Sequence, residues 1–207
     1  MILTRENFLS FFMLNYLYIL YQILYNFISG GFSMIENFVP DIYQKSIYYI
    51  NYDKLFKKGI RCILFDLDNT ITPSHIKLPT KRLKKLFDEL RNKGFKIIIL
   101  SNAPRHRIEP FKNYLNVDAC SFSLKPKSNK YEKIMEKFSY KPTEIAAVGD
   151  KLITDIYGAN KLDITSILVN PLTSKDYYVT IFYRIIEKFI FNKLNKRDLF
   201  LKGKYYE

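Results

Sequence analysis

Cysteine and histidine are scarce in this sequence. Its 207 residues include two cysteines, Cys62 and Cys120, and two histidines, His75 and His106. A disulfide framework would need more cysteines, so the cell interior is the simpler setting, and we expect both cysteines to be buried in strands. No group of cysteines and histidines has the spacing of a zinc site. Both histidines are expected in solvated loops or helices, although His75 is near enough to Asp68 to touch a substrate.

Acidic residues are outnumbered, with 20 aspartates and glutamates against 33 lysines and arginines, a formal net charge of +13. Such an excess suits an anionic partner, such as a phosphorylated substrate, nucleic acid or an acidic membrane surface. A lysine-rich composition explains the charge equally well, so charge alone does not identify the partner. The apolar content of 48% is typical of a globular chain, and the length allows one α/β domain with tails.

Charge is absent altogether from Asn7 to Ile35. This run is long enough to cross a bilayer as a helix, but polar residues interrupt it and its tyrosines are not gathered at the ends. It could also lie in the membrane interface. A further hypothesis is that the Gly-Gly pair upstream of Met34 is encoded by a ribosome-binding sequence, which would make Met34 the true start. We therefore expect a hydrophobic segment over 1–33, either a membrane anchor or a mis-called start, followed by one domain over 34–207.

Apolar runs and helical repeats alternate after Glu36, which predicts repeated strand and helix units. The predicted strands are Arg61–Asp66, Lys96–Leu100, Ala119–Phe122, Glu144–Val148 and Thr165–Val169. The predicted helices are Thr80–Lys93, Arg105–Leu115, Ser128–Phe138 and about Leu152–Lys161. Strands that alternate with helices of this length form right-handed βαβ units, so we expect an α/β fold with a Rossmann-like, doubly wound parallel sheet.

Polar residues follow four of these apolar runs. The four clusters are Asp66 with Asp68, Ser101-Asn102, Lys125-Pro126-Lys127, and Gly149-Asp150 with Thr154-Asp155. Ligands of doubly wound sheets bind outside the carboxyl ends of the strands. An Asp-x-Asp pair alone is common in turns, but four clusters in this order predict one shared site.

These residue types together predict phosphoryl transfer. Asp66, Asp150 and Asp155 would crowd three carboxylates, which is unfavourable without a cation, and hard oxygen ligands favour Mg²⁺. A carboxylate beside such a metal can attack phosphorus. A second aspartate, such as Asp68, can protonate the leaving alkoxide and then deprotonate the attacking water. Ser101 and a lysine can stabilise the charge on the phosphoryl oxygens.

The four clusters resemble the motifs of the haloacid dehalogenase (HAD) superfamily. The matching residues are Asp66-x-Asp68-x-Thr70, Ser101-Asn102, Lys125-Pro126 and Gly149-Asp150-x-x-x-Thr154-Asp155. More narrowly, from about Met34 the chain resembles the YqeG-type phosphatases of subfamily IIIA, whose relatives include mitochondrial phosphatidylglycerophosphate phosphatases. The resemblance implies a HAD-like fold and an Mg²⁺-dependent phosphatase.

Applied to this sequence, the resemblance makes Asp66 the nucleophile and Asp68 the general acid and base. It implies that Asp66, Asp150 and the backbone carbonyl of Asp68 hold the metal, with Asp155 and Thr70 in support. Phosphatases of the superfamily carry an aspartate two residues after the nucleophile, and relatives that cleave carbon–halogen bonds lack it. Dehalogenation is therefore disfavoured.

The same resemblance implies that Ser101, Asn102 and Lys125 bind the phosphate. Lys127 could replace Lys125, and the sequence leaves both open. The short reach that such a contact tolerates favours Lys125.

The spacing between the clusters leaves no room for a cap domain. Ten residues, 71–80, precede the first predicted helix, and 23 residues separate Ser101 from Lys125. Neither gap can hold a domain, so we expect a capless fold with an open site. A large substrate could then exclude water itself, as a protein, a polynucleotide or a lipid headgroup would.

The C-terminal segment is expected to form an amphipathic helix with basic flanks. Its apolar residues recur at helical spacing; they are Val179, Phe182, Tyr183, Ile186, Phe189 and Ile190, widened by Ile181, Ile185 and Phe191. Such a helix could pack against the sheet or lie in an anionic membrane interface.

The sequence therefore predicts a phosphomonoester hydrolase, and the resemblance to the phosphatidylglycerophosphate phosphatases implies phosphatidylglycerophosphate as its substrate. We expect a cytoplasmic protein that can associate with the inner face of the membrane. One alternative is a HAD phosphatase that acts on a nucleotide, a phosphoprotein or an RNA end. The other is a nucleic-acid-binding or ribosome-associated protein on a HAD fold, although the complete set of aspartates argues against an inactive site. The oligomeric state stays open.

Overall fold

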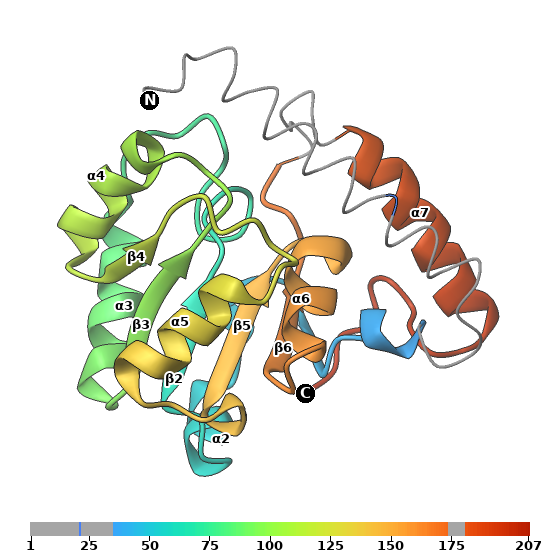
Figure 1. Cartoon of the computed structure of the whole chain (residues 1–207), viewed down its shortest axis with the longest axis horizontal. Helices are drawn as coiled ribbons and strands as arrows, with labels where there is room; N and C mark the ends of the chain where they lie inside the picture. Colours follow the sequence, from blue (N-terminus) through green and yellow to red (C-terminus); the bar gives the residue numbers. More distant parts are fainter. Residues whose placement is uncertain (1–20, 22–34, 174–180) are drawn as a thin grey trace.

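The computed structural model describes residues 21, 35–173 and 181–207 (Figure 1). The hypotheses about residues 1–33 therefore concern residues that, apart from Tyr21, lie outside the described part. The same holds for Val179 and for the side chains of residues 181–184. Within the described ranges, no helix has both the length and the hydropathy that a membrane span requires.

Six parallel strands form one sheet in the order β1-β6-β5-β2-β3-β4. The strands are β1 (Ile42–Gln44), β2 (Cys62–Phe65), β3 (Lys96–Leu100), β4 (Asp118–Cys120), β5 (Ile145–Gly149) and β6 (Thr165–Val169). The five strands predicted from the sequence are confirmed to within two residues at each end. The doubly wound parallel sheet is confirmed with them.

Helices cover both faces of this sheet (Figure 1). They are α2 (Tyr52–Lys57), α3 (Lys81–Asn92), α4 (Arg105–Leu115), α5 (Asn129–Phe138), α6 (Tyr157–Asn160) and α7 (Ile181–Lys196). The chain also forms the 3₁₀ turns η2 (Glu36–Phe38), η3 (Ile47–Tyr49) and η4 (Pro142–Glu144), and the π-helical turn η5 (Leu152–Ile156). The helix predicted over 152–161 is thus η5 followed by α6.

Successive residues of the central strands face opposite cores, as the alternation of side chains along a strand requires. Ile63 and Phe65 of β2 belong to the core under α2, α3 and α4, where Phe65 stacks on Phe87 with ring centroids 5.0 Å apart. Cys62 and Leu64 belong to the core under α5 and α6. Both faces are therefore apolar, which explains the uninterrupted apolar run of β2.

The order of the strands reverses between β5 and β2. From β2 the chain continues outward to β3 and β4, and it then returns to place β5 on the other side of β2. Such a switch point opens a crevice at the carboxyl ends of the strands. Residues 71–80 form a connection there, and residues 102–124 contain α4 and β4, so neither gap holds a cap domain.

The C-terminal helix is confirmed, and it packs against the body of the protein. Ile190 and Leu194 of α7 are buried in a core with residues of β1, β6 and η5, while Ile185 and Phe189 are 63% and 56% exposed. After α7 the chain returns to the edge of the sheet, where Tyr206 exchanges backbone hydrogen bonds of 2.9 and 3.0 Å with Tyr43 of β1. This pairing covers an edge strand that would otherwise be open.

Both cysteines lie in strands, as predicted. Cys62 is buried in β2, and Cys120 is half-buried at the end of β4. His75 and His106 are exposed, in a connection and in α4.

Candidate active site

The nucleophile candidate Asp66 and the metal-ligand candidate Asp150 directly follow the neighbouring strands β2 and β5. The Asp66 amide donates to the Val148 carbonyl at 2.9 Å, which extends the pairing of the two strands to their ends. A carboxylate oxygen from each of Asp66, Asp150 and Asp155 lies within 4.8 Å of the other two. All three residues are at least nine-tenths buried. The structure therefore gathers the three predicted carboxylates at the switch point of the sheet.

A π-helical turn, η5, carries Asp155 back to the end of β5. The Ile156 amide donates to the Lys151 carbonyl at 3.3 Å, and the Lys151 amide donates to Oδ2 of Asp155 at 3.1 Å. The turn passes so close to Gly149 that a Cβ there would lie 2.2 Å from Cγ of Asp155. Gly149 is required because Asp155 occupies the space that a side chain would fill.

The Lys125 ammonium lies between two of the carboxylates. Its Nζ is 2.7 Å from Oδ1 of Asp66 and 2.6 Å from Oδ1 of Asp155, and the side chain is 4% exposed. Burial alone would lower the pKa of Lys125, but Asp155 and Asp66 outweigh burial and place the pKa above its ordinary value. Lys125 is therefore a fixed positive charge at the predicted nucleophile, the position for which the sequence left Lys127 as an alternative.

Asn102 holds the segment that delivers Lys125. Its Oδ1 accepts from the Lys125 amide at 2.8 Å and from the Ser123 hydroxyl at 2.6 Å, and its Nδ2 donates to the Lys125 carbonyl at 3.2 Å. This side chain is therefore engaged with the protein itself. Its role in phosphate binding stays a prediction.

Two hydroxyl groups, those of Thr70 after β2 and Ser101 after β3, lie at the carboxyl ends of the strands. The Thr70 hydroxyl donates to Oδ1 of Asp150 at 3.1 Å and is 3.5 Å from Oδ2 of Asp66. Ser101 is 3% exposed, and its Oγ accepts from the Ala103 amide at 3.2 Å. Because an oxygen that accepts can still donate its own hydrogen, Ser101 keeps a donor for a phosphoryl oxygen.

Asp68 lies apart from the three clustered carboxylates. Its Oδ1 accepts from Nη2 and Nε of Arg107 at 2.7 and 3.1 Å. Burial raises the pKa of Asp68 above its ordinary value, against the opposing effect of Arg107. From the sequence, Arg107 was predicted to lie in a helix, and no role was assigned to it. The helical spacing of apolar residues in α4 does not show that Arg107 contacts Asp68, 39 positions earlier in the chain.

Two further charged residues near the site, Lys151 and Glu187, were not assigned a role from the sequence. The Nζ of Lys151 is 3.7 Å from Oδ1 of Asp150, and the side chain is 15% exposed. Glu187 of α7 is buried and accepts from the Ile153 amide of η5 at 3.3 Å, and burial raises the pKa of Glu187 to about 7. Glu187 follows Ile186 and precedes the buried Ile190 by about one helical turn, and an acidic residue on this apolar face is a sequence signal that could have found it.

The three carboxylates fit a divalent cation. Oδ2 of Asp150 is buried, and no donor in the described part of the chain reaches it. Burial raises the pKa of Asp150 to about 7, with Asp66 and Asp155 adding to the rise and Lys151 opposing it. A cation beside this oxygen would satisfy it and keep the carboxylate ionised. An all-oxygen set of ligands suits a hard ion.

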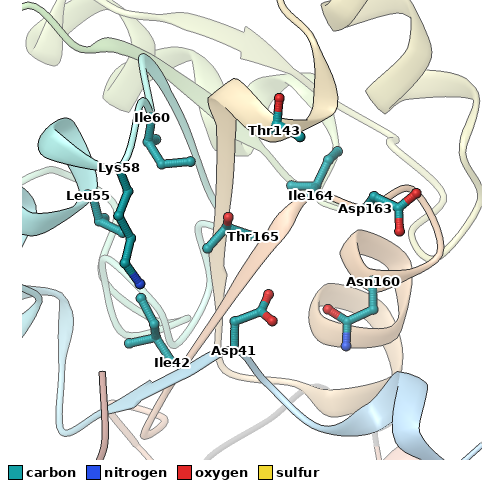
Figure 2. A pocket seen from close by; sticks show the side chains of 10 residues that line it. All are labelled: Asp41, Ile42, Leu55, Lys58, Ile60, Thr143, Asn160, Asp163, Ile164 and Thr165. Carbon is teal, nitrogen blue, oxygen red and sulfur yellow. The ribbon is translucent and has the colours of Figure 1, made fainter.

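A cavity of about 520 Å³ lies away from the carboxylates, at the amino ends of the strands (Figure 2). Its lining includes Asp41, Ile60, Thr143 and Thr165, which precede or begin four parallel strands. This cavity is therefore separate from the carboxylates at the carboxyl ends.

Comparison with known proteins identifies the family. A family model described as haloacid dehalogenase-like hydrolase matches residues 74–163. The protein named "Probable phosphatase YqeG" of Bacillus subtilis (strain 168) is 31% identical over 160 residues, which cover 77% of this chain and 93% of that protein. The chain belongs to the haloacid dehalogenase-like hydrolases. It is a phosphatase of this family, and the predicted resemblance is confirmed.

Two further matches are more distant. "Phosphatidylglycerophosphate phosphatase 1, chloroplastic/mitochondrial" of Arabidopsis thaliana is 22% identical over 178 residues, which cover 79% of this chain and 47% of that protein. The cobalt-bound deoxy-D-mannose-octulosonate 8-phosphate phosphatase of Haemophilus influenzae matches with a TM-score of 0.45 and 17% identity, over 71% of this chain and 95% of that one. The chain thus spans about half the length of the Arabidopsis protein.

Chelator-treated protein is expected to lose stability as the pH rises. The pKa of Asp150 is about 7 in the folded state and about 4 in an unfolded chain, so the native state binds this proton more tightly. The resulting stabilisation is complete at low pH and is lost as the pH rises to about 7. Between about pH 5.5 and 8 the loss in unfolding free energy should be about 2 kcal/mol, measured by urea denaturation.

Asp150→Asn is the matched control, because its side chain cannot titrate, and its stability should depend less on pH. Saturating Mg²⁺ should stabilise the native protein most at pH 8, since the ion binds the deprotonated carboxylate. Equal pH dependence in the native and variant proteins would contradict the prediction.

Proposed function

We propose that this phosphatase is an Mg²⁺-dependent phosphomonoester hydrolase that works through an aspartyl-phosphate at Asp66. The observation that carries the proposal is the position of Asp66, which shares the Lys125 ammonium with Asp155 and lies in one cluster with Asp150. A carboxylate with a fixed cation and a metal site beside it can approach a phosphoryl group without electrostatic repulsion.

The two aspartates of the first motif divide the chemistry. Asp66 attacks phosphorus, so an oxygen–phosphorus bond forms there while the ester bond to the leaving group breaks. Asp68 gives its proton to the leaving oxygen. It then takes a proton from the water that attacks the phosphorus of the aspartyl-phosphate, which releases phosphate and restores Asp66.

The remaining residues hold the groups that carry charge. Asp66 and Asp150, with Asp155 in support and the Asp68 carbonyl as a further ligand, would hold Mg²⁺, which when bound neutralises charge on the phosphoryl oxygens. Lys125 stabilises the same oxygens from the other side, and the Ser101 hydroxyl donates to one of them. The hydrogen bonds of Asn102 to the Lys125 segment give it a supporting role for Lys125 in addition to any contact with phosphate.

Phosphatidylglycerophosphate is the proposed substrate, with the enzyme acting in the cytoplasm at the inner face of the membrane. Support comes from the likeness to the Arabidopsis phosphatase of that name. The exposed apolar residues Ile185 and Phe189 of α7, which flank the exposed Lys188, give a surface of the kind that anionic membranes bind.

Asp66→Asn should abolish turnover. We expect the native protein to release phosphate from a chromogenic monoester in the presence of Mg²⁺, and the variant to lose at least about 10³-fold in kcat because an amide cannot act as the nucleophile. Asp198→Asn, at an exposed position, is the control and should keep full activity. Comparable activity in Asp66→Asn would end the proposed mechanism.

Lys125→Met should lower kcat/KM much more than Lys127→Met. Removal of the ammonium beside Asp66 is expected to lower kcat/KM at saturating Mg²⁺ by roughly 10²-fold or more, whereas Lys127→Met should change it by less than about threefold. An equal loss in both variants would show that Lys127 shares the role.

Depletion of the protein in cells should lead to accumulation of phosphatidylglycerophosphate, measured by lipid mass spectrometry. Expression of the native chain should reverse the accumulation, and Asp66→Asn should not. If the lipid does not accumulate, another phosphomonoester, such as a nucleotide, a phosphoprotein or an RNA end, becomes the better candidate.

A further inference from the structure

The carboxyl group of Asp68 is held by two hydrogen bonds that end on the same oxygen. Nη2 and Nε of Arg107 in α4 donate to Oδ1 at 2.7 and 3.1 Å, and no hydrogen bond within the described residues ends on Oδ2. Each oxygen of a carboxylate has two lone pairs, so these two donors occupy Oδ1 fully. A proton bound by Asp68 therefore lies on Oδ2.

The guanidinium of Arg107 is itself fixed by its surroundings. It lies 4.9 Å from the ring centroid of Phe111, which is buried in the core, and Nη2 is 3.4 Å from the Pro73 carbonyl. The side chain is 11% exposed. Because a guanidinium is a rigid planar fork, its fixed position also fixes the carboxyl group to which it is bonded.

One donor of Arg107 is left without an acceptor in this arrangement. Nη1 is buried, and no acceptor in the described part of the chain reaches it. Buried donors of this kind are uncommon in native proteins, and each costs free energy. The guanidinium therefore lies where its bonds to Asp68 are satisfied and not where all of its donors are, which indicates a functional constraint on the pair.

The backbone of Asp68 is fixed separately, by the tight turn that follows β2. The Ile71 and Thr72 amides each donate to the Leu67 carbonyl at 3.2 Å. This turn holds the Cα of Asp68, but rotation about the side-chain bonds would remain. Arg107 removes that freedom, and a general acid is efficient only when it is held within hydrogen-bond reach of the leaving oxygen.

We infer that Arg107 is a positioning residue, which holds Asp68 so that Oδ2, and not Oδ1, delivers the catalytic proton. The inference rests on the proposed phosphomonoesterase mechanism. When the bond between phosphorus and the leaving oxygen breaks, the proton passes from Oδ2 to that oxygen, and Asp68 becomes a carboxylate paired with the guanidinium. In the second step Asp68 takes a proton from the water that attacks phosphorus, which restores the acid.

The dependence of the rate on the leaving group tests the inference, with the full chain and Mg²⁺. 4-Nitrophenyl phosphate and 4-methylphenyl phosphate are similar in size, but the first releases a stabilised anion and the second a more basic one that needs a proton. Both form the same aspartyl-phosphate, so kcat/KM compares only the steps up to loss of the leaving group. The ratio of the two values in one preparation does not depend on the fraction of the enzyme that is folded.

Arg107→Gln should lower kcat/KM at least about tenfold more for 4-methylphenyl phosphate than for 4-nitrophenyl phosphate, because the poorer leaving group depends on the acid. Asp68→Asn, which removes the acid, should show the same selective loss. Arg107→Lys keeps the charge and a donor and should recover part of the loss. Arg105→Gln, exposed in the same helix, is the matched control and should leave the ratio unchanged.

Equal losses for both substrates in Arg107→Gln would show that Arg107 supports the fold or the phosphoryl group, and would overturn the inference. A selective loss in Asp68→Asn without one in Arg107→Gln would overturn it as well. Equal losses in Asp68→Asn would instead contradict the assignment of Asp68 as the acid. Failure of the native protein to hydrolyse any monoester would refute the proposed function itself.

Discussion

The ion pairs of Lys125 at the carboxyl edge of the sheet are the interaction on which the site depends. Asp66, Asp150 and Asp155 come together where β2 and β5 end, and carboxylates at that distance repel one another in a buried setting. Lys125 relieves two of them through bonds of 2.7 and 2.6 Å. Within residues 35–173 and 181–207, Asp150 receives the Thr70 hydroxyl on one oxygen and has the Lys151 ammonium at 3.7 Å. Lys125 therefore offsets the charge of Asp66 and Asp155, whereas no donor of the described residues reaches Oδ2 of Asp150, and a metal ion bound there would offset the third charge.

Most of the charged side chains of the site lie in segments outside the strands, and these segments need contacts that hold them in place. Asn102 fastens the Lys125 segment through three hydrogen bonds, and η5 brings Asp155 back over Gly149. The buried Glu187 of α7 accepts from the backbone of η5. The C-terminal helix thus supports the turn that carries Asp155, in addition to packing against the sheet.

The side chains of the site differ in burial. Around Lys125, the buried and paired side chains of Asp66 and Asp155 have little freedom, which would suit a reaction whose transition state needs charges already in place. Asp68 and Arg107 are more exposed than Asp66 and Lys125, and residues 71–80 form a connection rather than a cap domain.

Much of this organisation could be predicted from the sequence. Apolar runs such as Lys96–Leu100 are long and buried on both faces, so periodicity alone locates them, and the polar residues that follow them locate the site. The strand β1 was missed because Ile42–Gln44 is only three residues long and becomes a strand through its pairing with β6. The helix α2 has only six residues, too few for a helical repeat to be recognised.

The amino-acid sequence by itself determined the α/β class, the order of the strands and helices from β2 to β6, the absence of a cap between the motifs and the positions of the candidate aspartates. Only the tertiary structure decided which charges meet. It placed Lys125 between two aspartates, Arg107 against Asp68 and Glu187 against η5, at separations of 30 to 59, 39 and 34 residues along the chain. Periodicity reports which face of an element is apolar, but it contains no information about the partner of a charged side chain, because that partner is set by how the elements pack.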